Sequence, residues 1–563
     1  MDQFDYVIVG AGAAGCVLAA RLSEDPRVRV GLLEAGPPDR KREIAIPAAF
    51  AKLFRSEVDW GFSTAAEDGL DGREVFFPRG RTLGGSTSIN AQMYVRGPRD
   101  DFDAWGPGWS YEDLLPYFRR AEDNARGSDG FHGVGGPLRV EDQRDPNPLT
   151  LAFCEAAVQA GIPANPDVNG AKQDGVGLVQ VTQHRGRRFS AADAYLRPAR
   201  RRRNLSVLTG AHALELVLDG RRARGVAFGR PDGSRVVARA RREVLLCAGA
   251  IGSPQLLMLS GIGPAEHLRA HGLDVVRNLP GVGQNLVDHP IVGLFVATDR
   301  PVSLFAAERP RQLVAWLCRR RGLLSSNVGE AVAFVRTRPG LTAPDLELVF
   351  CPVLFVEEGL APPPRHGFTV AAAAVDPASR GQVALRSSDP LTAPAIRPGY
   401  LSDPDAADLA VLVHGLRLAR RIVRAPALEC WAGAELGPGP EARRDGELSA
   451  WIRAKAQSFY HPVGTCALGE HELAVVDRRL RVHGVDALRI VDASVMPRIV
   501  RGHTQAATIA IAERGAELIR SGPAPPSADS AAPAAEPQTS SRHPTDSQPR
   551  ADIRVLDEAR REA

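Results

Sequence analysis

The chain has few lysines, few aromatic residues and no long hydrophobic run. Lysine occurs only at positions 41, 52, 172 and 455, so the 70 basic residues are nearly all arginines. They are almost balanced by 66 acidic residues, and the net charge of +4 gives no reason to expect binding to nucleic acid or to a membrane. No stretch reaches about 18 consecutive apolar residues, which argues against an integral membrane segment.

Cysteine is also sparse. The seven cysteines are scattered, with no C-x-x-C pair and no spacing typical of metal ligands. This pattern predicts free thiols in a reducing compartment and no metal site. The N-terminal stretch "MDQFDYVIVG" enters a strand pattern at once, without the basic segment of a signal peptide, so we expect a cytoplasmic protein.

A chain of 563 residues is long for one hydrophobic core, and two closely packed domains are the default expectation. Near the N-terminus, a strand pattern at 5–9, a helix pattern at 13–25 and a strand pattern at 27–36 form a βαβ unit. Further strands are expected at 204–210, 223–229, 243–249 and 488–494. The segment 521–563 is rich in Pro, Ala and Ser and is expected to be a disordered tail.

The turn of the βαβ unit carries a nucleotide-binding pattern, "GAGAAG" at 10–15. Gly10 allows a tight turn, Gly12 lets the backbone approach a pyrophosphate, and Gly15 lets helix and strand pack closely. Glu34 ends the second strand, where its carboxylate can accept both ribose hydroxyls. A glycine-rich turn without a ligand is the alternative, but the strand before and the helix after this pattern favour nucleotide binding.

Three later stretches indicate FAD rather than NAD. They are "RGRTLGGSTSIN" at 79–90, "LLCAGAIGSPQLL" at 245–257 and "RIVDASVMP" at 489–497. The first offers a Gly-Gly pair and the amide of Asn90, the second only small residues after a strand, and the third Asp492 at a strand end. One such stretch suffices for an NAD domain, whereas an extended FAD that lies across the fold needs several.

In these motifs the chain resembles the glucose–methanol–choline (GMC) flavoprotein oxidoreductases, in particular bacterial choline-dehydrogenase-like alcohol dehydrogenases. The resemblance also includes "LPGVGQNLVDHP", "HPVGTC" and "VDASVMPRIVRGHTQAATIAIAE". It implies an α/β fold, with a Rossmann-like FAD domain and an interleaved α+β substrate domain that contains an antiparallel sheet. The FAD domain would comprise 1–40, 75–100, 190–295 and 472–520, and the substrate domain 101–189 and most of 296–471.

The resemblance also assigns residues to the cofactor. Those residues are Gly10, Gly12, Ala13, Ala14, Gly15, Glu34, Ala35, Thr82, Gly85, Asn90, Tyr94, Ala213, Asp492, Ala493, Thr504 and Gln505. Family members that bind FAD covalently use a histidine just before the Asn of the "GGS" loop. That position is Ile89 here, so non-covalent FAD is expected.

Two histidines are the candidate catalytic residues. In the family, the histidine of "HPVGT" accepts the proton of an alcohol and a His or Asn of the C-terminal motif is its partner, which implies His461 and His503 here. The chemistry agrees, because an imidazole can be a neutral base near pH 7 while flavin takes the hydride. His289 in "NLVDHP" is interpreted as structural, and Phe459 and Tyr460 either line the pocket or belong to the core.

These features predict an FAD-dependent enzyme that oxidises the CH–OH group of a small-molecule alcohol. Hydroxynitrile lyases share the implied fold and keep a flavin that does not turn over, so a lyase is the main alternative. A flavin-holding protein without catalysis is a third. The sequence identifies neither the alcohol nor the electron acceptor, which can be oxygen, a quinone or another carrier.

Overall fold

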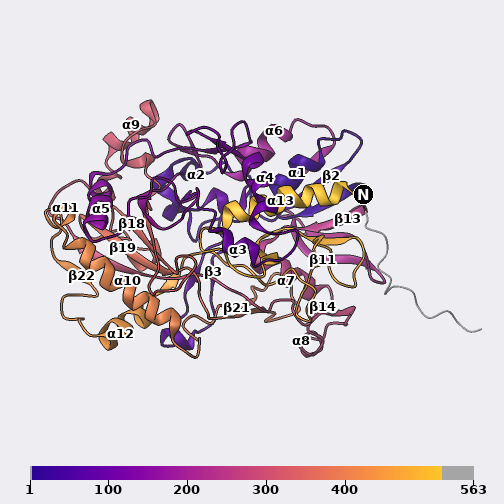
Figure 1. Cartoon of the computed structure of the whole chain (residues 1–563). Coiled ribbons are helices and arrows are strands. Elements are labelled where there is room, and N and C mark those ends of the chain that lie inside the picture. The colour runs from indigo at the N-terminus through magenta and orange to yellow at the C-terminus, as the bar shows by residue number, and fades with distance from the viewer. Residues whose placement is uncertain (1–2, 523–563) are drawn as a thin grey trace, which may run out of the picture. The chain divides into compact units, whose positions relative to one another are not determined.

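A computed structural model of the protein describes residues 3–522. Most of the tail expected to be disordered, 521–563, therefore lies outside the described residues. Within them, two seven-stranded sheets organise the chain, and they lie toward opposite ends of the view in Figure 1. No helix in this range combines the length and hydrophobicity required to cross a bilayer.

The first sheet has the spatial order β10-β2-β1-β13-β12-β11, with β24 beside β13. The strands are β1 (Gln3–Val9), β2 (Val30–Glu34), β10 (Leu205–Thr209), β11 (His212–Asp219), β12 (Arg222–Gly229), β13 (Arg235–Leu246) and β24 (Leu488–Ile490). β10, β2, β1, the second half of β13 and β24 run parallel, while β11 and β12 form an antiparallel hairpin against the first half of β13. Strands thus lie at the six ranges that the sequence patterns indicate, and β11 adds one that they did not.

Helix α1 (Ala13–Leu22) joins β1 to β2 and is built from small and apolar residues, most of them buried. A Cβ on Gly15 would lie 1.9 Å from the carbonyl oxygen of Gly10, so only glycine permits this close approach of helix and strand. The C-terminal helix α13 (Thr504–Arg520) lies along α1 (Figure 1), and the two are tied by a salt bridge between Arg21 and Glu513.

The second sheet is antiparallel throughout, in the order β22-β16-β19-β18-β17-β7, with β23 beside β16. The strands are β7 (Gly175–Leu178), β16 (Pro290–Ala297), β17 (Ala331–Val335), β18 (Leu346–Cys351), β19 (Gly367–Ala374), β22 (Glu435–Gly437) and β23 (Gln457–Ser458). Helices α5 (Pro148–Gln159) and α10 (Ala407–Val423) pack on one face of it.

Alternation along these strands decides which side chains face the site. Leu346, Leu348 and Phe350 of β18 belong to the core under α10, while Val349 and Cys351 line the cavity on the opposite face. β16 and β19 alternate in the same way. The remaining helices lie outside the two sheets: α2 (Arg42–Ala45), α3 (Arg99–Asp103), α4 (Tyr111–Ala121), α6 (Arg197–Ala199), α7 (Gly249–Leu259), α8 (Ala265–Ala270), α9 (Pro310–Arg319), α11 (Pro426–Glu429) and α12 (Asp445–Lys455). The fold is therefore the predicted α/β architecture with a Rossmann-like parallel sheet and a second, antiparallel sheet.

Candidate active site

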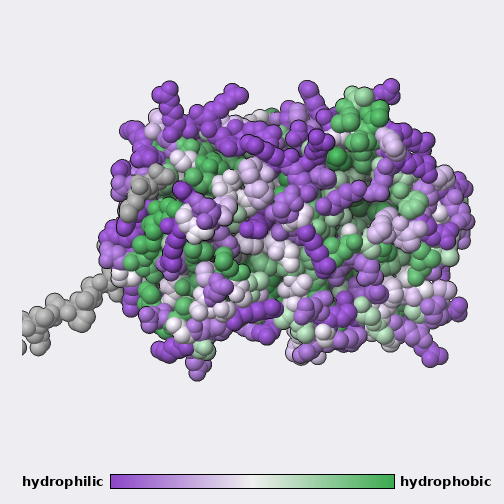
Figure 2. Space-filling model, turned by 180° about the vertical axis from the view of Figure 1, so that it is seen from behind, coloured by the Kyte–Doolittle hydropathy of each residue, from purple (hydrophilic) through white to green (hydrophobic). Residues whose placement is uncertain are grey.

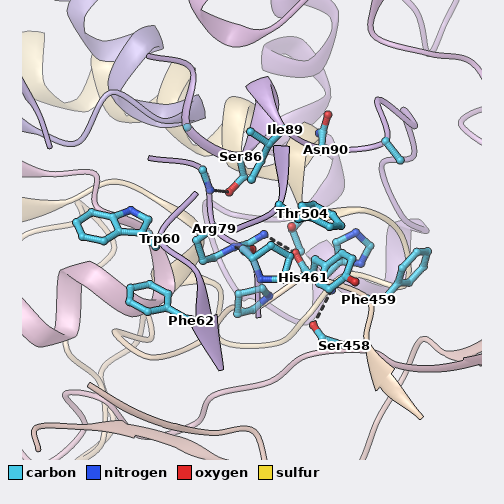
Figure 3. Close-up of a pocket in the computed structure, with 18 of the residues that line it drawn as sticks. Trp60, Phe62, Arg79, Ser86, Ile89, Asn90, Ser458, Phe459, His461 and Thr504 are labelled. Carbon is cyan, nitrogen blue, oxygen red and sulfur yellow. Dashed lines mark hydrogen bonds between the residues drawn. The ribbon is translucent and has the colours of Figure 1, made fainter. Parts of the chain in front are cut away.

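A cavity of about 730 Å³ lies between the two sheets. Residues at the carboxyl ends of β1, β2, β13 and β24 form one side of it, and the inward-facing residues of β16, β18 and β19 form the other. Crevices at the carboxyl ends of parallel strands are the usual binding place in open α/β sheets. Figure 3 shows part of this cavity, with His461 and Phe459 on one side and Trp60 and Phe62 on the other.

The first end of the cavity has the backbone of a nucleotide site. Of the residues assigned to the adenosine half, Gly10, Gly12, Ala13, Ala14, Glu34, Ala35 and Ala213 line the cavity. Gly10 has φ +95°, a conformation that favours glycine. Gly85 approaches so closely that a Cβ on it would lie 2.7 Å from the Cα of Gly12. Helix α1 begins here with no side chain capping its first N–H groups, which leaves these donors available to a phosphate.

Glu34 is buried at this end. Its carboxylate accepts hydrogen bonds from the backbone N–H groups of Ala11 (2.9 Å) and Gly36 (2.8 Å). Burial raises the pKa of Glu34 to about 7, although these two hydrogen bonds oppose the rise. Ribose hydroxyls donated to this carboxylate would stabilise its charged form.

Three assigned residues do not line the cavity. Gly15 acts through helix packing, as described above. The hydroxyl of Thr82 donates to the carbonyl of Pro37 (2.8 Å). Tyr94 is buried, and its hydroxyl accepts from Nε of Arg96 (3.4 Å), so its polar end belongs to a separate cluster.

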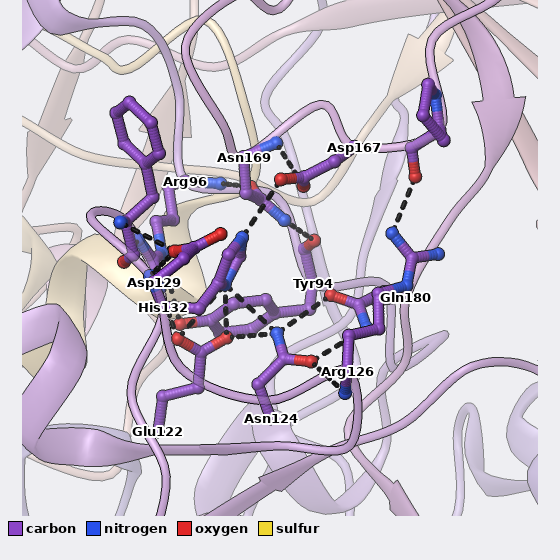
Figure 4. Close-up of polar contacts among 12 residues, drawn as sticks. Tyr94, Arg96, Glu122, Asn124, Arg126, Asp129, His132, Asp167, Asn169 and Gln180 are labelled. Atoms are coloured by element: carbon purple, nitrogen blue, oxygen red, sulfur yellow. Dashed lines mark hydrogen bonds and ion pairs between the residues drawn. The ribbon is translucent and has the colours of Figure 1, made fainter.

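That cluster surrounds a second buried histidine, His132 (Figure 4). Nδ1 of His132 lies 3.1 Å from Oε1 of Glu122, and Nε2 lies 3.0 Å from Oδ2 of Asp167. Arg96, which is 1% exposed, also pairs with Glu122 (2.5 Å). Burial opposes a charge on His132, but the hydrogen bonds to Asp167 and Glu122 prevail and raise its pKa to about 9.

The other end of the cavity has donors without partners. Asn90, Ala493, Thr504 and Gln505 all line it. Asn90 donates to Oε1 of Gln505 (2.6 Å), and Nε2 of Gln505 is buried with no hydrogen-bond partner within the described residues. Gln505 also lies in the first turn of α13, whose N–H groups open toward the cavity. An orphaned amide donor suits the carbonyl-rich edge of a flavin ring, so the residues present fit FAD.

Asp492 lines the cavity, but its carboxylate is already engaged by protein donors. One oxygen accepts from Ser253 (2.6 Å) and Gly249 (2.9 Å), and the other accepts from the N–H of Ser494 (2.8 Å). The side chain therefore fixes the start of α7 and the turn after β24, which together shape the wall.

His461 follows β23 and has a rigid backbone. Its N–H donates to Oδ1 of the buried Asp288 (2.7 Å), and Val463 pairs with Val287 as an isolated bridge. The preceding Tyr460 has φ +67°, a strained conformation held by a hydrogen bond from its N–H to Ser458 (2.8 Å). These contacts aim the imidazole into the cavity.

The rings of His461 and His503 meet at the cavity wall, with their centroids 4.8 Å apart. His503 is held by its N–H to the carbonyl of Val95 (3.1 Å) and by Nε2, which donates to the buried Glu347 (3.0 Å). Burial lowers the pKa of His461 well below its usual range, and the neighbouring His503, His289 and Arg79 lower it further. His461 is consequently neutral at pH 7.

His289 touches His461 directly. The two Nδ1 atoms are 3.1 Å apart, and burial, followed by the charge of His503, lowers the pKa of His289 to about 3. One of these nitrogens must donate and the other must accept, so the contact couples the tautomers of the two rings. His289 thus has a closer connection to the site than the structural role that the sequence suggested.

Several contributors were missed by sequence reasoning. Asp288 stands one position before His289 in a motif that had been noted, and Arg79 opens the "RGRTLGGS" stretch. Glu347 could have been recognised as a functional candidate, because it is an acid in the middle of the apolar strand "LELVF". Phe459 and Tyr460, left undecided between pocket and core, both line the cavity, and the ring of Phe459 contacts His461 (4.6 Å between centroids).

Comparisons with known proteins agree with this geometry. Family models of the GMC oxidoreductases match residues 4–291 and 377–512. An uncharacterized GMC-type oxidoreductase of Mycobacterium tuberculosis is 51% identical over 530 residues, which are 92% of this chain and 99% of the relative. A Pseudomonas putida alcohol dehydrogenase (acceptor) is 42% identical over 529 residues, 92% of this chain and 96% of the relative. The crystal structure of pyridoxine 4-oxidase from Mesorbium loti has a TM-score of 0.84 and 34% identity, and the match covers 92% of this chain and all of that one.

The cavity, the two histidines and the nucleotide-binding turn define a flavin-dependent oxidoreductase. The chain belongs to the GMC oxidoreductase family, as its motifs indicated. It is an FAD-dependent enzyme that oxidises alcohols. The lyase alternative finds no support among the matched proteins.

Proposed function

We propose that His461 is the base that takes the hydroxyl proton of the alcohol. The observation that carries this proposal is the contact between two imidazoles at the cavity wall, with their ring centroids 4.8 Å apart. Within the described residues no protein atom hydrogen-bonds Nε2 of His461, so this nitrogen is open to a substrate hydroxyl. Bound FAD supplies the acceptor for the hydride that leaves the carbon.

His289 supports this role by accepting a hydrogen bond from His461. When Nδ1 of His461 carries its proton, it donates to Nδ1 of His289, and Nε2 keeps a lone pair for the alcohol. After proton transfer both nitrogens of His461 are protonated, and the same donation persists. Because the pKa of His289 is about 3, His289 remains a neutral acceptor throughout.

His503 orients the alcohol oxygen. Its Nε2 is committed to Glu347, so its ring is fixed while its other nitrogen remains for a polar contact. Glu347 lies on β18, in the second sheet, and His503 immediately precedes α13, which packs on the first. The pair therefore joins the two halves of the site at the position where the alcohol oxygen is to be held.

The substrate that suits this cavity is an uncharged alcohol with an apolar body. Beside the histidines, the inward-facing residues of the second sheet are mostly apolar: Ile291, Gly293, Phe295, Val349, Cys351 and Ala371. A quaternary ammonium group requires an aromatic cage, and the rings of Phe54, Phe355 and Tyr460 in the same cavity make choline the alternative substrate to be tested. Bound FAD would pass its electrons to an acceptor, which can be oxygen, a quinone or another carrier.

Anaerobic mixing of the purified holoenzyme with a panel of alcohols tests the proposal. Medium-chain primary alcohols should bleach the flavin band, and choline should do so with a lower second-order rate constant. Bleaching by dithionite but by no alcohol would reject alcohol oxidation. A preference for choline would reject only the apolar substrate class. Repeating the turnover with oxygen and with a soluble quinone distinguishes the acceptors.

We also propose that FAD is held without a covalent bond. Ile89 lines the cavity beside Asn90 and is 3% exposed, and its side chain has no nucleophile. Acid precipitation should release the yellow colour into the supernatant. Colour retained in the washed pellet would contradict non-covalent binding.

A further inference from the structure

Helix α9 presents its apolar side to solvent. Leu313, Val314 and Leu317 are 44%, 59% and 55% exposed, and their spacing places them on one face of the helix. Phe305, just before the helix, is 40% exposed and extends the same apolar surface. Figure 2 shows the molecule from behind, and hydrophobic side chains gather there on a raised part of the surface at the upper right, which corresponds to the position of α9 at the upper left of Figure 1.

The opposite side of α9 is anchored to the protein. Trp316 is buried, and its indole N–H donates to the carbonyl of Gly186 (2.9 Å). The guanidinium of Arg320 stacks on this indole at 3.9 Å, and Arg321 pairs with Asp145 (2.8 Å). The outward direction of the apolar face is therefore set by several contacts and is not an accident of one rotamer.

Arginines flank this apolar face. Arg309, Arg311 and Arg319 are exposed, and none of them forms an ion pair with any residue in 3–522. The nearest acid in sequence, Glu308, is already paired with Lys52 (2.6 Å). The face is thus apolar in the middle and positively charged at its edges.

We propose that α9 and Phe305 dock this enzyme on the surface of an anionic lipid bilayer. A helix with an apolar face and arginines beside it lies in the plane of the lipid headgroups, where both parts are satisfied. A second copy of the chain fits less well, because a two-fold contact through α9 would bring the same unpaired arginines of both copies together. The net charge of the whole chain does not reveal this surface, because its positive charge comes from a few arginines beside α9.

The docking surface is continuous with the wall of the catalytic cavity. Leu304 and Ala307 pack in one cluster with Phe50 and Phe54, and these two phenylalanines line the cavity. Docking would hold this wall beside the bilayer, so that an alcohol or a quinone dissolved in lipid could enter. This consequence rests on the proposed function, whereas the docking itself does not.

Co-sedimentation of the full-length holoenzyme with lipid vesicles tests the docking. We expect binding to vesicles of equal parts phosphatidylglycerol and phosphatidylcholine, and weak binding to pure phosphatidylcholine. The triple variant Leu313→Gln, Val314→Gln, Leu317→Gln should lose at least about tenfold in affinity, because three apolar side chains no longer enter the lipid. Arg311→Gln with Arg319→Gln should lose roughly 25-fold, about fivefold for each arginine. The control Leu151→Gln with Val158→Gln changes two similarly exposed residues of α5 and should bind like the wild type.

A fluorescent label gives a second measurement on the same surface. Cys318 lies on α9, and Cys430 is also exposed but follows α11. An environment-sensitive dye on Cys318, in a Cys430→Ser background, should shift to the blue when anionic vesicles are added. The same dye on Cys430, in a Cys318→Ser background, should not shift.

Three results would overturn the proposal. The first is no binding of the wild type to anionic vesicles, and the second is binding that the α9 variants leave unchanged. The third is a wild-type dimer that the triple variant converts to a monomer, which would assign the surface to a second copy of the chain. Flavin bleaching by alcohols is measured without lipid, so failure of the docking and failure of the proposed function are separate outcomes.

Discussion

The protein contains two histidine clusters in which the pKa of the central imidazole is shifted in opposite directions. His461 shares its surroundings with His503, His289 and Arg79, and its pKa falls well below the usual range. His132 lies between Glu122 and Asp167, and its pKa rises to about 9. Burial opposes the charged form in both clusters, so the difference comes from the partners. Cationic or neutral neighbours keep a base neutral, whereas carboxylates turn the same side chain into a structural cation.

The comparison extends to the contacts around each ring. Both nitrogens of His132 are engaged by carboxylates, and no nitrogen is left for another group. Among residues 3–522, His461 has a ring hydrogen bond at Nδ1 only, so Nε2 stays available to a ligand in the cavity. A histidine that is buried and still has a free nitrogen is suited to catalysis, while one that is fully satisfied is suited to holding the fold.

The largest expected effect is that of His461→Ala on catalysis. Loss of a positioned base should slow anaerobic flavin reduction by roughly 10²-fold or more. Stopped-flow absorbance on the fully flavinated variant measures this rate, and His414→Ala on α10 is the control. Near-normal reduction in His461→Ala would mean that the base lies elsewhere.

The pH dependence of the wild type sharpens the same point. Because the pKa of His461 is lowered, the base form persists as pH falls, and the reduction rate should stay constant between pH 8 and 6.5. It should decline only below pH 6.5. An acid limb centred above 6.5 would contradict a base in these surroundings.

The second effect is that of His132→Gln on stability. Removing the cation leaves buried carboxylates less well paired, and we expect a loss of roughly 2–4 kcal/mol in the free energy of unfolding. Urea unfolding of the holoenzyme measures it. His184→Gln, which removes a half-exposed histidine paired with Glu141, should change stability little.

The sign of the pH effect follows from the raised pKa of His132. Its folded pKa of about 9 exceeds the ordinary value of about 6.5. The stabilisation is therefore complete below pH 6.5 and is lost as pH rises through 9. The variant should show a smaller loss of stability than the wild type over this range, and equal losses would remove His132 as the cause.

The smallest expected effect is that of His503→Asn. The amide of asparagine can still form a hydrogen bond with the alcohol, so flavin reduction should slow by only about tenfold. Glu347→Gln keeps a hydrogen-bond acceptor beside His503 while it removes the charge, and it serves as the paired variant. If His503→Asn were as slow as His461→Ala, the two histidines would share the role of base.

The sequence alone determined the nucleotide half of this protein. The nucleotide site is built from consecutive segments: a strand, the turn "GAGAAG", a helix, a second strand and an acid. Local sequence patterns predict it, because these segments are neighbours along the chain. The same holds for Ile89, whose identity bears directly on how FAD is attached. The motifs that contain "HPVGT" and "RGHTQ" pointed to His461 and His503 as the candidate catalytic pair, because the family resemblance assigns roles by matching position. Thr82 and Tyr94 do not line the cavity, and their assignment to the cofactor stays a prediction.

Tertiary structure decided the contacts that give these residues their chemistry. His503 and Glu347 are 156 positions apart, and His289 and His461 are 172 apart, so no local pattern could pair them. The partners of His132 also come from two segments, since Glu122 begins the short strand Glu122–Asn124 and Asp167 lies in a loop. Helix α9 is amphipathic by sequence, and an amphipathic pattern normally predicts a buried apolar face. Tertiary contacts, among them those of Trp316 with Gly186 and of Arg321 with Asp145, determine that this face points outward, because burial is a property of what surrounds a side chain and not of its position in the chain.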